Sequence, residues 1–149
     1  MPATEEFPDP PSEYLRAARE TAWLVMALAE RLQRGFAAHA AGFGLSAAQA
    51  KVLLRLRPEE NLPMRTLARG LGYDPSNLTG LVDKLEARGA VERRPDPADR
   101  RVKAIALTGE GLRLREDFQR RLVGDAGALA SLSDSQLHEL RNLLRTALA

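Results

Sequence analysis

The residues best suited to recognise another molecule lie between Asp74 and Thr108. The first part of this stretch, from Pro75 to Arg88, repeats leucine and valine at helical spacing, which commits one face of the predicted helix to a core. Short polar side chains hydrogen-bond to base edges in the major groove of DNA, and a glycine lets the backbone approach closely. A solvent-exposed helix without a ligand also fits this pattern. The opposite face carries Ser76, Asn77, Thr79, Gly80, Asp83 and Lys84.

An arginine-rich hairpin follows this helix directly. Residues 90–93 and 102–107 alternate at strand spacing around a Pro-Asp-Pro loop, which predicts a β-hairpin. Cations gathered on a two-stranded ribbon repel one another unless an anion lies nearby, and a phosphate backbone with its minor groove supplies one. A charged run alone is usually a solvated loop, but after two short helices it indicates a wing. Its basic residues are Arg93, Arg94, Arg100, Arg101 and Lys103.

Short helices precede the polar helix and position it. Ser46 and Gln49 form a capping-box pattern at the start of one helix, and residues 64–71 form the next. The turn Gly72-Tyr73-Asp74 leads into the polar helix, with Asp74 as its N-cap and Pro75 at its first position. Two short helices joined by a tight turn predict a helix-turn-helix.

Apolar stripes at both ends of the chain predict a partner. A long helix from about Ser12 ends at glycines near residue 44, Thr108 caps another helix, and a second capping box begins at Ser133. These helices are more apolar than a core of about 60 residues can cover. We therefore predict a mainly α fold, a winged helix-turn-helix with terminal dimerisation helices. The expected parts are a flexible acidic, proline-containing arm (1–12), an N-terminal dimerisation helix (13–44), the winged helix-turn-helix DNA-binding domain (45–108) and C-terminal dimerisation helices (109–149).

Composition narrows the function. The chain has 149 residues, a net charge of +2, a pI near 9.4 and no cysteine, so disulfides and thiolate metal sites are excluded. No apolar run approaches the roughly 20 residues that span a bilayer, and we expect a cytoplasmic protein. His39 and His138 have no acidic or thiol partner at ligand spacing, so no metal site is expected. Because no phosphate loop, nucleophile elbow or acid-paired histidine is recognisable, we predict neither an enzyme nor a cofactor.

Three motifs follow one another through the hairpin region: LEARGAVER at residues 85–93, DRR at 99–101 and LTGEG at 107–111. They resemble the signature of the multiple-antibiotic-resistance regulator (MarR) family, in which LE-x-x-G-x-V-x-R is followed by D-x-R at the wing and LT-x-x-G at the next helix. The order of elements also matches from about Tyr14 to the C-terminus. Each motif alone is weak, but together they are specific.

The resemblance implies a homodimer whose terminal helices interlock across a two-fold axis and whose wings touch double-stranded DNA. Arg101 would reach the minor groove or phosphates, whereas Asp99 would brace the arginines because a phosphate repels a carboxylate. Two recognition helices about 34 Å apart predict a pseudo-palindromic operator. The predicted DNA-binding residues are Arg65, Thr66, Ser76, Asn77, Thr79, Gly80, Lys84, Arg93, Arg94, Asp99, Arg100, Arg101 and Lys103.

Relatives in this family commonly bind small aromatic or phenolic anions between the dimerisation helices and the winged core. Trp23 lies roughly 150° from the middle of the apolar stripe of its helix, so it either packs in the dimer interface or lines an effector pocket. By the resemblance, the expected pocket residues are Trp23, Met26, His39, Phe43 and Met64, each of which also fits a core position.

The predicted function is a ligand-responsive transcription regulator, a repressor that a small aromatic effector releases from DNA. The alternative is a winged-helix adaptor whose basic hairpin binds an acidic protein. A regulator would bind one sequence tightly above a looser electrostatic mode, whereas an adaptor would bind any duplex weakly.

Overall fold

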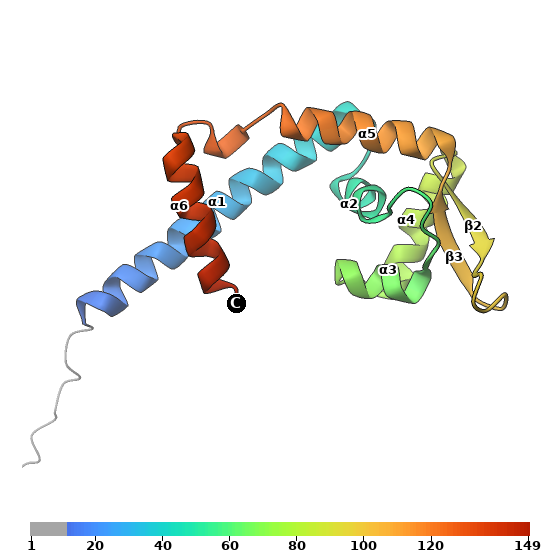
Figure 1. The fold of residues 1–149 in the computed structure, drawn as a ribbon, viewed down its shortest axis with the longest axis horizontal. Helices are drawn as coiled ribbons and strands as arrows, with labels where there is room; N and C mark the ends of the chain where they lie inside the picture. Colours follow the sequence, from blue (N-terminus) through green and yellow to red (C-terminus); the bar gives the residue numbers. More distant parts are fainter. Residues whose placement is uncertain (1–11) are drawn as a thin grey trace, which may run out of the picture.

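The computed structural model describes residues 12–149, and the predicted arm at residues 1–12 lies outside this range except for Ser12. Figure 1 shows a long helix, α1, extending from a lobe that holds the short helices and the strands. Helix α1 spans Glu13–Gly42, and Ser12 caps its start by accepting a hydrogen bond from the Leu15 amide at 3.3 Å. It ends where Gly44 takes a left-handed φ of 67°, as its glycines predict.

The lobe is built from three short helices and a small sheet. Helices α2 (Ala47–Arg55), α3 (Met64–Leu71) and α4 (Pro75–Ala87) are followed by the antiparallel pair β2 (Val91–Pro95) and β3 (Lys103–Leu107). The Ser46–Gln49 capping box forms as predicted. Asp74 occupies the N-cap position of α4, but its side chain makes no capping hydrogen bond.

A third strand was not predicted from the sequence. β1 (Leu62–Pro63) pairs with β3, so that the sheet order is β1-β3-β2 and Leu62 lies opposite Ile105. The Asn-Leu-Pro sequence indicates only a break between helices, because a two-residue strand has no periodicity. Pro63 is tolerated there because it sits on an edge strand.

Helix α5 (Gly109–Val123) joins the lobe to α1 and to the helix at the C-terminus. These two outer helices, which do not include residues 1–11, are called the arm from here on. Phe118 of α5 is fully buried and packs edge-on against Phe36 and Phe43, with ring centroids 5.4 and 5.5 Å apart. At the start of α5, Thr108 accepts a hydrogen bond from the Gly111 amide and donates one to the Gly89 carbonyl. A side chain at Gly111 would collide with the backbone, since a Cβ there would lie 1.7 Å from the Ala90 oxygen. This junction fixes α5 against the turn that follows α4.

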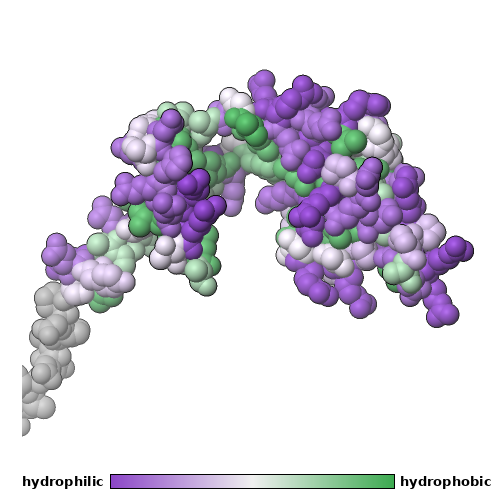
Figure 2. All heavy atoms as spheres, in the orientation of Figure 1, coloured by the Kyte–Doolittle hydropathy of each residue, from purple (hydrophilic) through white to green (hydrophobic). Residues whose placement is uncertain are grey.

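The arm exposes large apolar side chains. After the short 3-10 helix η1 (Gly127–Leu129), α6 (Asp134–Ala147) begins at the predicted Ser133 capping box and buries no residue. In α1 only Ala40 is buried, and Trp23 is 68% exposed. Figure 2 shows hydrophobic residues along the arm, whereas the surface of the lobe is mostly hydrophilic. The exposed large apolar residues of α1 and α6 are Tyr14, Leu15, Trp23, Leu24, Val25, Met26, Leu32, Leu143 and Leu148.

Candidate nucleic-acid interface

Helix α4 presents one polar face to solvent because its other face is committed to the core. Leu78, Val82 and Leu85 are fully buried. Helix α3 ends at Gly72, whose left-handed φ of 66° turns the chain into α4. The residues predicted to face the major groove are all exposed: Ser76, Asn77, Thr79, Gly80 and Lys84.

Two details of this face bear on what it can recognise. The Thr79 hydroxyl donates to the Pro75 carbonyl at 2.9 Å, which leaves its oxygen as an acceptor and fixes its methyl group. A Cβ at Gly80 would meet no atom within 4 Å, so packing within the chain does not require glycine there. The glycine leaves the helix backbone uncovered by a side chain at the centre of the polar face.

The wing carries its cations at the tip of the β2–β3 hairpin. Arg93 lies opposite Ile105 in the register, and Pro95 lies opposite Lys103. The predicted strand limits are shifted: β2 runs on to Pro95 and β3 begins at Lys103, one residue late, because Val102 belongs to the turn. There the Val102 carbonyl accepts from the Asp96 amide at 2.9 Å.

Aspartates hold the loop at the tip rather than projecting from it. Asp96 accepts a hydrogen bond from the Ala98 amide at 2.7 Å, and Asp99 accepts one from the Arg101 amide at 3.0 Å. Asp99 thus braces the backbone of the D-x-R motif, and among the described residues it forms no ion pair with the arginine side chains that it was predicted to brace. Within residues 12–149 no carboxylate lies within ion-pair distance of Arg100, Arg101 or Lys103, which are all exposed.

Arg93 is placed differently from the other wing cations. Its guanidinium pairs with Asp83 at 2.5 Å and with Glu86, both on α4, and its backbone amide donates to Glu86 at 3.3 Å. The hydrogen bond to Asp83, together with the charges of both carboxylates, raises the pKa of Arg93. The prediction treated Arg93 as an outward-facing cation, but the side chain bends back and joins the base of the wing to α4. Its neighbour Arg94 pairs with Glu92.

The remaining predicted phosphate contacts, Arg65 and Thr66, are exposed in the first turn of α3. They lie at the start of the helix that precedes α4, at the opposite end from the tight turn at Gly72. Together with α4 and the wing they give one lobe three groups of donors that project outward from separate elements.

The predicted effector residues are not gathered in one place in the single chain. Trp23 and Met26 lie on the exposed part of α1, and Met64 packs against the lobe core. His39 and Phe43 do share a small pocket of about 240 Å³ near the end of α1. The step of 13 residues from Met26 to His39 on one helix already separates these positions by roughly 20 Å at about 1.5 Å per residue, so one chain cannot gather them in a single pocket.

His39 has an acidic partner, contrary to the sequence-based expectation. Its Nε2 lies 3.0 Å from Oδ2 of Asp125, in the connection between α5 and η1. The two residues are 86 positions apart, so no local pattern reveals the pair. His138 is exposed and its Nδ1 lies 2.9 Å from the Asp134 carbonyl. In the part of the chain that the structure describes, no cluster of three or more histidine, cysteine or acidic side chains can hold a metal ion.

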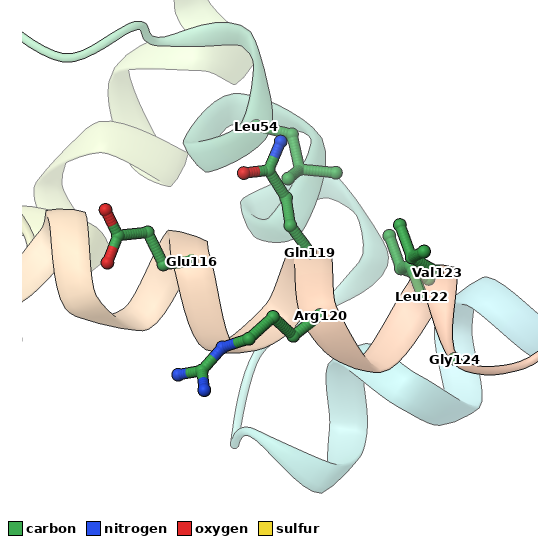
Figure 3. A pocket seen from close by; sticks show the side chains of 7 residues that line it. All are labelled: Leu54, Glu116, Gln119, Arg120, Leu122, Val123 and Gly124. Carbon is green, nitrogen blue, oxygen red and sulfur yellow. The ribbon is translucent and has the colours of Figure 1, made fainter.

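Two open grooves flank the junction between arm and lobe. One, of about 840 Å³, lies between α2 and the second half of α5. Figure 3 shows Leu54 on α2 and Leu122 and Val123 on α5 lining it, while Arg120 points away from Leu54. The other groove, of about 630 Å³, lies between α1 and α2, and its lining includes Phe36, Ala47 and Lys51.

No helix within the described range is long and apolar enough to cross a membrane.

Comparison with known proteins places this geometry among transcription regulators. A family model described as the MarR family matches residues 45–103, which hold α2 to α4 and the wing. An uncharacterised HTH-type transcriptional regulator of Bacillus subtilis, YhbI, is 33% identical over 103 residues, covering 68% of this chain. The match spans 66% of YhbI, just under two thirds of its length.

Solved structures match over a longer part of the chain. Apo MarR from Escherichia coli has a TM-score of 0.76 at 27% identity, covering 86% of this chain and 96% of that one. CouR from Rhodococcus jostii, bound to p-coumaroyl-CoA, has a TM-score of 0.69 at 31% identity, covering 87% of this chain and 92% of that one. The likeness therefore includes the arm as well as the winged lobe.

Proposed function

Because the chain belongs to the MarR family, we propose that it is a homodimeric transcription regulator that binds a pseudo-palindromic DNA operator and that a small aromatic effector releases from it. Each part of this proposal is supported by a different region of the molecule. The lobe supports DNA binding, the arm supports the dimer, and a groove between them supports the effector.

The observation that carries the DNA proposal is the division of charge on the lobe. Asp83, on the polar face of α4, is neutralised by Arg93, while the side chains of Arg100 and Arg101 at the wing tip form no ion pair within the described residues. A polar face that carries no unopposed negative charge can enter a major groove, and the wing tip can contact phosphates or the minor groove alongside it. We propose that Asn77 and its neighbours on α4 supply the sequence reading.

The arm supports a dimer because its apolar surface has no cover in a single chain. Large exposed side chains of this kind mark an interaction surface in soluble proteins. Val123, at the end of α5 beside the α2–α5 groove, is 89% exposed and adds a further uncovered apolar side chain. We propose that a second copy covers α1 and α6, which would place two α4 helices about one turn of DNA, roughly 34 Å, apart.

The groove between α1 and α2 is the proposed effector site. Phe36 offers an aromatic edge, and Lys51 offers a cation that no carboxylate within residues 12–149 neutralises. Arg34, also in the lining, is held by Glu30 at 3.7 Å. A flat aromatic acid matches such a lining, and the ligand of CouR contains an aromatic acyl group. His39 and Phe43 lie at the C-terminal end of α1, within two turns of Phe36 in this groove. Trp23 and Met26 are proposed to pack against the partner.

The experiment that tests the proposal is selection of bound duplexes from a random pool with the full chain, followed by a salt titration. We expect an enriched inverted repeat that binds at least about 10³ times more tightly than unrelated duplex at physiological salt. Sedimentation at the same concentrations should give a dimer. A single subunit, or equal binding to every duplex, contradicts the proposal.

The effector is tested next, on the selected duplex. A panel of aromatic acids is titrated into the complex, and at least one acid should release the DNA. Aliphatic acids of the same charge are the control, because they add the same ionic strength without an aromatic ring. If no acid releases the duplex, the effector part of the proposal fails while the DNA part stands.

A further inference from the structure

Arg88, directly after α4, is bonded to the end of the dimerisation arm. Its Nη1 donates to the Gly44 carbonyl at 3.0 Å and its Nη2 donates to the Phe43 carbonyl at 2.6 Å. Both carbonyls lie just beyond α1, where the helix leaves its acceptors unsatisfied and its dipole favours a cation. One guanidinium therefore caps the C-terminal end of α1 from the C-terminal end of α4.

The arm side of this link is rigid. Phe43 packs edge-on against the buried ring of Phe118, and its amide donates to the α1 carbonyls of Ala40 and Ala41. Gly44 holds a left-handed conformation, and its space is limited, since a Cβ there would lie 3.3 Å from Nη1 of Arg88. The two acceptors are thus held in fixed positions, so a bidentate donor that binds both is fixed in direction as well as in distance.

On the side of the lobe, Arg88 provides the polar link between α4 and the end of α1. In the described part of the chain, no other hydrogen bond or ion pair joins α4 or its cap to α1 or to the turn after it. Helix α4 is otherwise held by its buried leucines and by Arg93, which ties it to the wing rather than to the arm. The direct polar connection between the helix that faces DNA and the helix that faces the partner is this one side chain.

We propose that Arg88 is a positioning residue that sets the tilt of α4 relative to the arm, and thereby selects operators by the spacing of their half-sites. The proposal rests on the function proposed above and adds a residue that does not face the DNA. It assigns Arg88 to geometry between the subunits rather than to contact with bases.

The length of α4 makes a small tilt matter. Ser76 lies twelve residues before Arg88, which at about 1.5 Å per residue is a lever of roughly 18 Å. A tilt of about 10° at Arg88 moves the far end by about 3 Å, close to the roughly 3.4 Å that separates successive base pairs. A protein that holds this angle distinguishes spacers that differ by one base pair, and a protein that does not hold it loses the distinction.

The first experiment measures spacer discrimination. The operator selected with the wild-type chain is shortened and lengthened by one and two base pairs in its spacer, and the affinities are compared. We expect Arg88→Ala to reduce the ratio between the best spacer and its neighbours by at least about fivefold, and Arg88→Lys, which keeps the charge but has a single donor nitrogen, to lie between. Arg113→Ala is the matched control, because Arg113 is an exposed helical arginine whose one ion pair within residues 12–149 is with Glu110.

The second experiment needs no DNA. The chain has no cysteine, so Ser76→Cys gives one spin label per subunit, at the end of α4 far from Arg88. The distribution of distances between the two labels should broaden when Arg88→Ala is added and should not change with Arg113→Ala. A loss of stability alone would lower the folded fraction without broadening the distances within folded dimers.

The outcomes separate this proposal from the one on which it depends. If the wild-type chain gives no distance between labels and no preferred spacer, the proposed dimeric regulator is wrong. If the wild-type chain discriminates spacers and Arg88→Ala discriminates them as sharply, with an unchanged label distribution, the role of Arg88 is overturned. Should Arg88→Ala not fold, Arg88→Lys must still show the intermediate ratio, and a wild-type ratio for it overturns the proposal as well.

Discussion

Replacing Arg93 by alanine should weaken DNA binding measurably while leaving the chain folded. The guanidinium pairs with Asp83 and Glu86 on α4, and Asp83 lies on the face proposed to enter the major groove. Without Arg93, that face carries an unopposed carboxylate, and the wing loses its side-chain tie to α4. The backbone hydrogen bond from residue 93 to Glu86 does not need the guanidinium and should persist.

The two effects have different sizes. Partly exposed ion pairs stabilise by about 0.2–1 kcal/mol each, so the two pairs amount to about 1 kcal/mol and a fall in Tm of about 2–4 °C. A carboxylate roughly 8 Å from a phosphate is repelled by about 2 kcal/mol at an effective dielectric constant of about 20. Screening over a Debye length of about 8 Å reduces this to about 0.7 kcal/mol, or about threefold in affinity per subunit and about tenfold per dimer.

Fluorescence anisotropy with the selected operator measures the affinity, and circular dichroism measures Tm. The decisive variant is the double change Arg93→Ala with Asp83→Asn, which removes the uncovered charge and should restore most of the lost affinity. If Arg93 instead contacts a phosphate directly, the double variant stays weak and the slope of log affinity against log salt falls by about one per subunit. That result, or wild-type affinity for Arg93→Ala alone, refutes the reasoning.

Three further substitutions test the wing, the reading face and the packing of the lobe. Arg101→Ala should weaken operator binding and lower the salt slope by about one per subunit with an unchanged Tm, and a wild-type affinity at physiological salt would remove Arg101 from the interface. Asn77→Ala should change the sequences enriched from a random pool more than it changes binding to unrelated duplex, so an unaltered preference would exclude Asn77 from base reading. Gly111→Ala should destabilise the chain by about 1–3 kcal/mol or more, because its Cβ would collide with the Ala90 carbonyl. Gly109→Ala is the control, since a Cβ there meets nothing within 4 Å, and thermal unfolding of the two variants compares them directly.

Local patterns account for what could be predicted from the sequence. The capping boxes at Ser46 and Ser133 both form, and the leucine and valine spacing of α4 correctly divides that helix into a buried and an exposed face. Each of these features depends on residues three or four positions apart, where a helix forces side chains together. The order of the six helices and of the hairpin strands follows from such signals and agrees with the fold of the relatives, whereas β1 and η1 do not follow from them.

Contacts between distant segments account for what could not be predicted. The partners of Arg93 are 7 and 10 positions away on another element, Arg88 reaches back 44 and 45 positions, and His39 meets Asp125 across 86 positions. A sequence shows that these side chains are charged but not which neighbours they meet. In the sequence, Arg93 stands beside Arg94 among the cations of the hairpin, so it resembles them. In the structure it lies opposite the buried Ile105, and its side chain meets two carboxylates of α4.

These distant contacts also explain how a chain with a net charge of only +2 can present a cationic surface. Asp83, Glu86 and Glu92 pair with arginine side chains on β2, and two aspartates at the wing tip accept hydrogen bonds from backbone amides. The cations that remain project toward solvent, so the field outside the lobe is more positive than the total charge indicates. Salt should therefore weaken DNA binding well before it disturbs the wing, because the internal pairs are in direct contact whereas the approaching duplex is attracted across a screened distance.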